Sequence, residues 1–94
     1  MLYSRTIWPQ NDSIMINKTI FDPKYKSMIK SLVQIRNQQG ISQRELADRL
    51  KRAHSYIGRI ETFERRLDVV DLINICKALG LTNKEILKQF EKLL

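Results

Sequence analysis

From Pro23 onward, hydrophobic residues recur every three or four positions, and this spacing predicts a series of short amphipathic helices. The first predicted helix begins after Asp22, because aspartate caps a helix N-terminus and the following proline suits the first helical position. It ends at Gly40, since glycine readily takes the left-handed conformation past a helix end. The apolar positions of this helix are Tyr25, Met28, Ile29, Leu32, Val33 and Ile35.

Two further helices are marked by the pattern of a capping box. In that pattern a serine or threonine, and a glutamate three residues later, each bond a free backbone amide. Ser42 with Glu45 predicts one helix start, and Thr82 with Glu85 predicts another, for a last helix that runs to about residue 93.

Between these two starts, helices are also expected over 54–62 and 68–80. The link at 51–53 is so short that the helices on either side of it must cross steeply. No segment here alternates between polar and apolar residues for long enough to predict a strand. The pattern therefore predicts an all-α fold, an orthogonal bundle of five helices.

The first 22 residues lack this periodicity and contain Pro9, Asn11 and Asp12, which favour irregular structure. We therefore expect a largely irregular N-terminal arm over 1–22 and one domain over 23–94. A chain of 94 residues has room for one such domain with a modest core.

The net charge of +7 is unevenly distributed along the chain. The 17 basic and 10 acidic residues balance within 1–22 and again within 68–94, so the whole excess lies within 23–67. A localised basic surface is typical of a protein that binds a polyanion such as DNA, although a merely solvated basic face explains the charge equally well.

Membrane association is not expected. No apolar run approaches the roughly 20 residues needed to cross a bilayer. The N-terminus is interrupted by Arg5, Pro9 and Asp12 and makes a poor signal peptide. We therefore expect a cytoplasmic protein.

Candidate catalytic chemistry is sparse. The one cysteine, Cys76, lies in an apolar helical pattern and is expected in the core, and His54 is the only histidine. The chain has no glycine-rich phosphate loop and no acid pair at a recognisable spacing. An enzyme is therefore disfavoured, and neither a metal nor another cofactor is expected.

The most specific features of the sequence are three spaced motifs. They are QRELADRL at 43–50, SYIGRIE at 55–61 and KALG at 77–80. In order and spacing they resemble the XRE-type (Cro/C1-type) helix-turn-helix family of small bacterial and phage regulators, and the resemblance extends from Tyr25 to Leu81. It implies a lambda-repressor-like fold, a helix-turn-helix over 41–61, and double-stranded DNA as the partner.

The resemblance also implies which residues read the DNA. The helix over 54–62 would lie in the major groove, where each base pair presents a distinct set of donors and acceptors. The usual base-contacting positions are occupied by His54, Ser55 and Arg59. Arg59 is the best candidate for a specific contact, because a guanidinium can pair bidentately with guanine.

Other residues are expected to contact the DNA backbone, which positions a protein without reading sequence. For two of them a structural role competes: Tyr56 suits the core equally well, and a solvated surface is the alternative for Arg44. Arg36 and Glu61 match positions that form a partly buried ion pair in the family, and we assign them to architecture. The expected backbone contacts are Gln43, Arg44, Arg52, Tyr56, Thr62, Arg65 and Arg66.

The chain departs from the family pattern around the reading helix. Lys51 stands where the turn usually carries glycine, and Ala53 stands where a capping serine or threonine is usual. Thr62 and Phe63 replace a usual Asn-Gly, so Phe63 is either exposed for a partner or tucked into the core. Gly58 is costly inside a helix, and it serves either close approach to DNA or tight packing.

One small domain buries little DNA, so we expect a homodimer on a two-fold site, acting as a transcriptional regulator and most simply as a repressor. The alternative is an antitoxin or another protein-interaction module of the same fold, whose arm over 1–22 would wrap a protein partner. The residues expected in the dimer contact, with closure of the core as their alternative role, are Ile86, Leu87, Phe90, Leu93 and Leu94.

Overall fold

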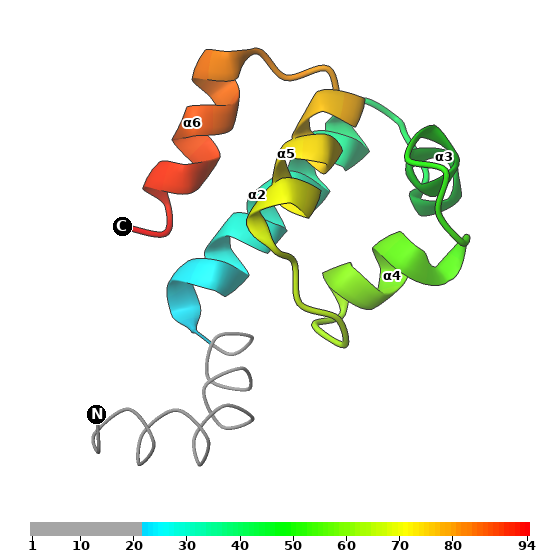
Figure 1. The fold of residues 1–94 in the computed structure, drawn as a ribbon, viewed down its shortest axis with the longest axis horizontal. Coiled ribbons are helices and arrows are strands. Elements are labelled where there is room, and N and C mark those ends of the chain that lie inside the picture. The colour runs from blue at the N-terminus through cyan, green and yellow to red at the C-terminus, as the bar shows by residue number, and fades with distance from the viewer. Residues whose placement is uncertain (1–21) are drawn as a thin grey trace, which may run out of the picture.

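The computed structural model describes residues 22–94, which form five α-helices and, over that range, no strand (Figure 1). The predicted all-α fold of five helices is thereby confirmed. The predicted N-terminal arm, apart from Asp22, lies outside the described residues. The helices are α2 (Pro23–Gln38), α3 (Gln43–Arg49), α4 (Ser55–Glu61), α5 (Val69–Ala78) and α6 (Asn83–Glu91).

The starts of α2 and α6 carry the predicted caps. The Asp22 carboxylate accepts from the backbone amides of Lys24 and Tyr25, at 2.8 and 3.4 Å. At α6 both bonds of the capping box form: the Thr82 hydroxyl accepts from the Glu85 amide at 3.2 Å, and the Glu85 carboxylate accepts from the Thr82 amide at 2.8 Å. These bonds satisfy amides that the first turn of a helix leaves unpaired.

The starts of α3 and α4 are capped less completely. The Ser42 hydroxyl accepts from the Glu45 amide at 3.0 Å, but the Glu45 carboxylate accepts from Arg49, at 2.9 Å, instead of returning to Ser42. Helix α4 has no side-chain cap, since His54 at its N-cap makes no such bond. A backbone bond pairs one amide of this first turn instead, because the Tyr56 amide donates to the Ala53 carbonyl at 2.9 Å.

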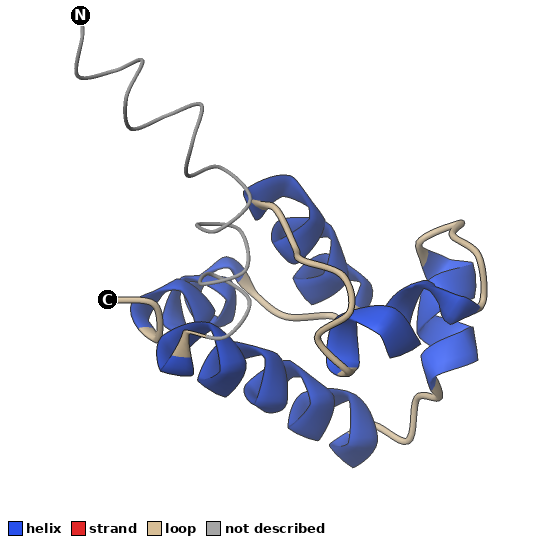
Figure 2. Cartoon of the chain, turned by 90° about the horizontal axis from the view of Figure 1, so that it is seen from below, coloured by secondary structure: helices blue, strands red, loops and turns tan. Residues whose placement is uncertain are grey.

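The core lies between the helices, and α2 to α5 all contribute to its centre. In Figure 1, α3 and α4 lie on one side of α2 and α6 lies on the other. Figure 2 shows that short loops connect the helices. The α3–α4 unit and α6 therefore offer separate surfaces. The most deeply buried large side chains are Met28 and Ile29 from α2, Leu46 from α3, Ile57 from α4 and Cys76 from α5.

Helix α6 buries one side and exposes the other. Ile86 is 6% exposed and belongs to the core, and Phe90 is half-buried against it. Ile86 is therefore not available for the dimer contact expected of it, because its own domain encloses the side chain. Leu87, Leu93 and Leu94 are exposed.

Cys76 is enclosed by the core, and burial raises the pKa of its thiol to about 11. At pH 8 only about one thiol in a thousand is then ionised, and the thiolate is the reactive species. We expect the native protein to leave a chromogenic disulfide reagent unreacted at pH 8 and the urea-unfolded chain to react fully, as followed by absorbance. Rapid reaction without denaturant would contradict the enclosure of Cys76.

Residues 22–94 lack two kinds of feature. No helix there combines the length and the apolar character needed to cross a membrane. No three histidine, cysteine or carboxylate side chains in that range are grouped so that they could hold a metal ion.

Candidate nucleic-acid interface

Helices α3 and α4 are joined by a tight turn. The Arg52 amide donates to the Ala47 carbonyl at 2.9 Å, and the Lys51 amide donates to the Asp48 carbonyl at 3.0 Å. Lys51 has a φ of 55°, in the left-handed region. Glycine suits this conformation because any Cβ is crowded in it. The turn thus has a geometry that favours glycine, but it is built with a lysine.

Replacing Lys51 by glycine is therefore expected to raise the free energy of unfolding by roughly 1 kcal/mol. The left-handed conformation costs a residue with a Cβ about 1–2 kcal/mol, and the greater freedom of glycine in the unfolded chain offsets part of the gain. Lys51→Ala is the matched control, because it removes the same charge and keeps the Cβ. Urea unfolding followed by circular dichroism compares the two, and equal stability would contradict the strain at Lys51.

One polar side chain from each of α2, α3 and α4 joins a network at the end of α4. Arg36 donates to both carboxylate oxygens of Glu61, with Nε–Oε2 and Nη2–Oε1 distances of 2.7 and 2.9 Å. Gln43 Nε2 donates to Glu61 Oε1 at 2.7 Å, and Arg36 Nη1 donates to the Ile41 carbonyl at 2.7 Å. Such bidentate, charge-assisted bonds have a restricted geometry. They therefore hold α4 in a defined orientation relative to α2 and α3.

The Gln43 side chain also accounts for Gly58. A Cβ at Gly58 would lie 3.2 Å from Gln43 Oε1, which is tighter than ordinary contact. The amide of Gln43 therefore lies close over the backbone of α4 at this point. This contact supports close packing between α3 and α4 as the reason for a glycine within α4.

Several side chains at this end of the molecule are exposed. Arg44, Ser55 and Arg59 make no side-chain hydrogen bond or ion pair within residues 22–94. His54 differs, because its Nε2 pairs with Asp48 Oδ1 at 3.0 Å. The Arg59 guanidinium thus offers its N–H donors to solvent, and such donors suit a guanine edge or a phosphate.

Tyr56 is 7% exposed, which places it in the core. Burial raises the pKa of its hydroxyl, and the nearby Asp71 raises it further. The guanidinium carbons of Arg52 and Arg65 lie 4.8 and 5.1 Å from the centre of its ring. Arg52 also pairs with Asp71 at 3.4 Å. Arg52, from the turn before α4, and Arg65, from the loop after it, therefore both lie over the Tyr56 ring. Both were expected to contact the DNA backbone.

The loop after α4 uses its side chains internally. The Thr62 hydroxyl lies 2.9 Å from the Gly58 carbonyl and 2.7 Å from the Glu64 carboxylate, so its single proton has acceptors within the protein. Thr62 is consequently poorly placed to donate to a phosphate. Phe63, with a φ of 63°, is half-buried against the core, and the Lys26 ammonium lies 5.5 Å from the centre of its ring. Of the two positions open to Phe63, the structure has the one against the core.

The same loop is attached to α2 near Arg66. The Tyr25 hydroxyl accepts from the Leu67 amide at 3.1 Å. Burial raises the pKa of that hydroxyl, while the Leu67 bond and the charge of Arg66 lower it. Arg66 itself is exposed. The loop therefore presents a basic side chain from an anchored backbone.

Two acidic residues lie at this basic surface, Asp48 within the first motif and Asp71 outside all three motifs. Asp48 lies beside His54, and Asp71 lies beside Arg52. The first contact is indicated by a spacing of six residues across a tight turn. The second joins residues 19 apart, and no local pattern in the sequence indicates it.

Comparisons with known proteins agree with this geometry. A helix-turn-helix family model matches residues 32–86, more than half of the chain. Among solved structures, the chain is similar to an XRE-family like protein from Pseudomonas syringae pv. tomato str. DC3000, with 35% identity and a TM-score of 0.70 over 82% of this chain and 94% of that one. A comparison with curated proteins gives no match.

The matched segment contains the Arg36–Glu61 pair, both helices of the turn and all of α5. The resemblance inferred from the three motifs is confirmed by both matches. The chain belongs to the XRE-type (Cro/C1-type) helix-turn-helix family, a family of DNA-binding transcription regulators.

Proposed function

We propose that this protein is a sequence-specific transcription repressor that reads the DNA major groove with α4. One observation carries the proposal: α4 is held by the Arg36–Glu61 pair while Arg59, on the same helix, is exposed and has no side-chain partner within residues 22–94. Direct readout requires a donor set presented from a fixed helix, because misplaced donors lose discrimination between bases. The arrangement meets that requirement.

Arg59 is proposed to pair with O6 and N7 of a guanine through two parallel N–H bonds. Ser55, at the N-terminus of α4, can donate or accept and therefore discriminates weakly between bases. His54 keeps one ring nitrogen beside its bond to Asp48, and we assign that nitrogen to a base edge. Readout thus rests mainly on Arg59.

The proposed backbone contacts surround α4. Arg44 comes from the first turn of α3, and Arg65 and Arg66 come from the loop after α4. Gln43 begins α3, where unpaired backbone amides and the helix dipole attract a phosphate. Because Gln43 is bonded to Glu61, a phosphate held there is positioned relative to the reading helix.

The repressor is proposed to bind as a homodimer, since one domain of this size contacts too few base pairs for high specificity. A two-fold dimer places two copies of α4 on half-sites about one helical turn apart. Leu87 and Leu94 are 63% and 91% exposed and are proposed for the contact between copies.

Selection of bound sequences from random double-stranded DNA tests the proposal. A sequence-specific repressor enriches one motif, which is palindromic if the protein binds as a dimer. The matched control is Arg59→Glu, which changes an exposed side chain and is expected to abolish enrichment while circular dichroism shows an unchanged helical fold. Absence of any enriched motif with folded wild-type protein would refute sequence-specific binding.

Arg66→Ala is expected to weaken binding to all sequences alike. It should also lower the slope of log affinity against log salt by about 1, because one phosphate contact and its released counterions are lost. Lys84→Ala is the control. Lys84 is exposed at the start of α6, so this substitution removes the same charge at a position away from α4. Binding titrations at several salt concentrations give the slopes. Equal slopes for Arg66→Ala and wild type would contradict the phosphate contact.

A further inference from the structure

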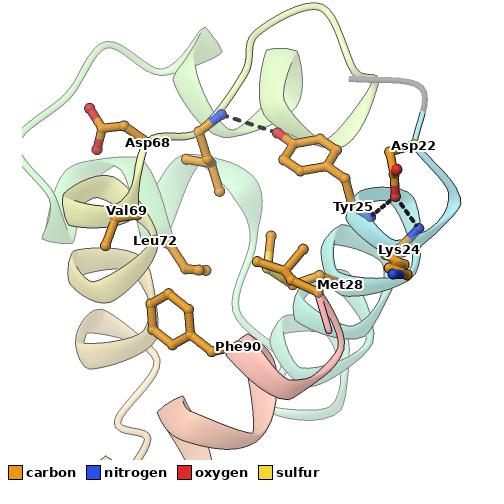
Figure 3. Close-up of a pocket in the computed structure, with 10 residues that line it drawn as sticks. Asp22, Lys24, Tyr25, Met28, Asp68, Val69, Leu72 and Phe90 are labelled. Atoms are coloured by element: carbon orange, nitrogen blue, oxygen red, sulfur yellow. Dashed lines mark hydrogen bonds between the residues drawn. The ribbon is translucent and has the colours of Figure 1, made fainter. Parts of the chain in front are cut away.

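A groove of about 310 Å³ opens between the N-terminal end of α2, the start of α5 and the end of α6 (Figure 3). Val69 lies on this groove and is 59% exposed, and Leu93 also contributes exposed apolar surface. A concave surface lined mostly by apolar side chains is a common type of binding site. The other apolar residues that line it are Tyr25, Met28, Leu67, Leu72 and Phe90.

The groove is separate from the DNA-reading surface. No residue of α3 or α4 lines it. Beside the groove, Lys24 Nζ at the start of α2 donates to the carbonyl of Leu94, which follows α6, at 3.1 Å. DNA binding therefore gives no account of why this apolar surface is open.

We propose that residues 16–21 of the same chain cover this groove. Asp22, the first described residue, is itself part of the lining, so the preceding 21 residues start at the groove. Six extended residues span about 20 Å, which is enough to pass from Asp22 across a hollow of this size. Residues 16–21 can therefore reach the groove directly from Asp22, without a linker.

The composition of this segment, taken with the two residues before it, matches the lining. Of residues 14–21, five of eight are large and apolar, whereas a tail that stays in solvent is typically poor in such residues. Lys18 is the only charged residue among those eight, and the Asp68 carboxylate lies at the groove. The apolar residues concerned are Ile14, Met15, Ile16, Ile20 and Phe21.

Effective concentration favours the chain's own segment over a second copy as the occupant of the groove. A segment joined to the groove by a short linker is present at an effective concentration in the millimolar range, whereas a separate copy competes only at its total concentration. At micromolar protein the chain's own segment therefore occupies the groove. This inference is independent of the proposed DNA readout.

Photo-crosslinking in the full-length chain tests the inference. Ile16 is replaced by p-benzoylphenylalanine, an apolar residue that forms a covalent bond to neighbouring C–H groups on illumination. We expect a product of monomer mass, with mass spectrometry locating the bond at groove residues such as Leu72 or Leu93. A product of dimer mass would assign the groove to a second copy, and the absence of any bond to groove residues would overturn the proposal.

Two neighbouring valines provide a matched pair of variants. Val69 lines the groove and Val70 does not, yet they are 59% and 64% exposed and both lie in the first turn of α5. A glutamate is tolerated in a first turn, so both variants should fold. Val69→Glu is expected to reduce the monomer crosslink several-fold, and Val70→Glu to leave it unchanged. Equal crosslink yields from the two variants would contradict binding in the groove.

Thermal unfolding gives a second measurement without the crosslinker. Ile16→Ser with Ile20→Ser is expected to lower the Tm by several degrees, because the apolar contact with the groove is lost. Leu2→Ser with Ile7→Ser makes the same chemical change outside the proposed segment and should leave the Tm unchanged. Equal Tm shifts in the two double variants would count against the proposal.

Discussion

Replacing Glu61 by alanine is expected to lower the free energy of unfolding by about 3 kcal/mol, the largest loss expected from a single polar substitution in this domain. The Arg36 and Glu61 side chains are only 9% and 13% exposed. Breaking a buried pair by removing one partner typically costs 3–5 kcal/mol, because the other charge is left buried and uncompensated. The Ile41 carbonyl still accepts from Arg36, so the lower end of that range applies.

This loss is large relative to the stability of the domain. Domains are typically stable by roughly 0.05–0.15 kcal/mol per residue, or about 4–11 kcal/mol for the 73 residues described here. Glu61→Ala should therefore shift the urea midpoint strongly, and it should also release Gln43 from α4. Circular dichroism during urea unfolding measures the change.

Two controls separate the buried charge from other effects. Glu91→Ala removes an exposed carboxylate at the end of α6 and should change stability by less than about 0.5 kcal/mol. Combining Glu61→Leu with Arg36→Met removes both charges and should recover most of the loss, because apolar replacement of a whole buried pair is often neutral. A double variant no more stable than Glu61→Ala would show that packing, and not charge, is responsible.

Arg59→Ala is expected to weaken binding to the selected DNA site by about 5- to 150-fold. A bidentate arginine–guanine pair contributes about 1–3 kcal/mol of discrimination between bases. The variant should accept any base at one position of the motif and should keep its preferences elsewhere. Titration of the selected site and its single-base variants at one salt concentration measures both effects.

The contrast with Arg44→Ala makes this test specific. Both side chains are exposed and have no side-chain partner among the described residues, so neither substitution should alter stability by more than about 0.5 kcal/mol. Because Arg44 is proposed to contact a phosphate, Arg44→Ala should weaken binding to all DNA sequences alike. An Arg59→Ala protein with unchanged affinity and unchanged motif would show that α4 is not the reading helix.

The helices and the family were predictable because their signals are local. A cap such as Asp22 acts on amides two or three residues away, and the Thr82–Glu85 box is complete within four residues. At Lys51 the family pattern marked only a departure from the usual glycine, and the left-handed conformation of the turn was found in the structure. The spacing and type of side chains are therefore enough to predict features formed by residues close together in the sequence.

The site required the tertiary structure, because its contacts join residues that are distant in the chain. Arg52 and Asp71 are 19 residues apart, and only the packing of α5 beside the turn brings them together. Burial also decided between roles that the pattern left open: it placed Tyr56 in the core and enclosed Ile86, while the adjacent Leu87 stayed exposed.

The sequence by itself therefore determined the helices of the described domain, the caps of α2 and α6 and the family to which the chain belongs. Only the tertiary structure decided which polar groups are already satisfied within the protein. The Thr62 hydroxyl and one nitrogen of His54 have internal partners, whereas Arg59 has none in the described part of the chain. The physical reason is that a hydrogen bond depends on distance and direction in space, and the folded packing of the helices sets both.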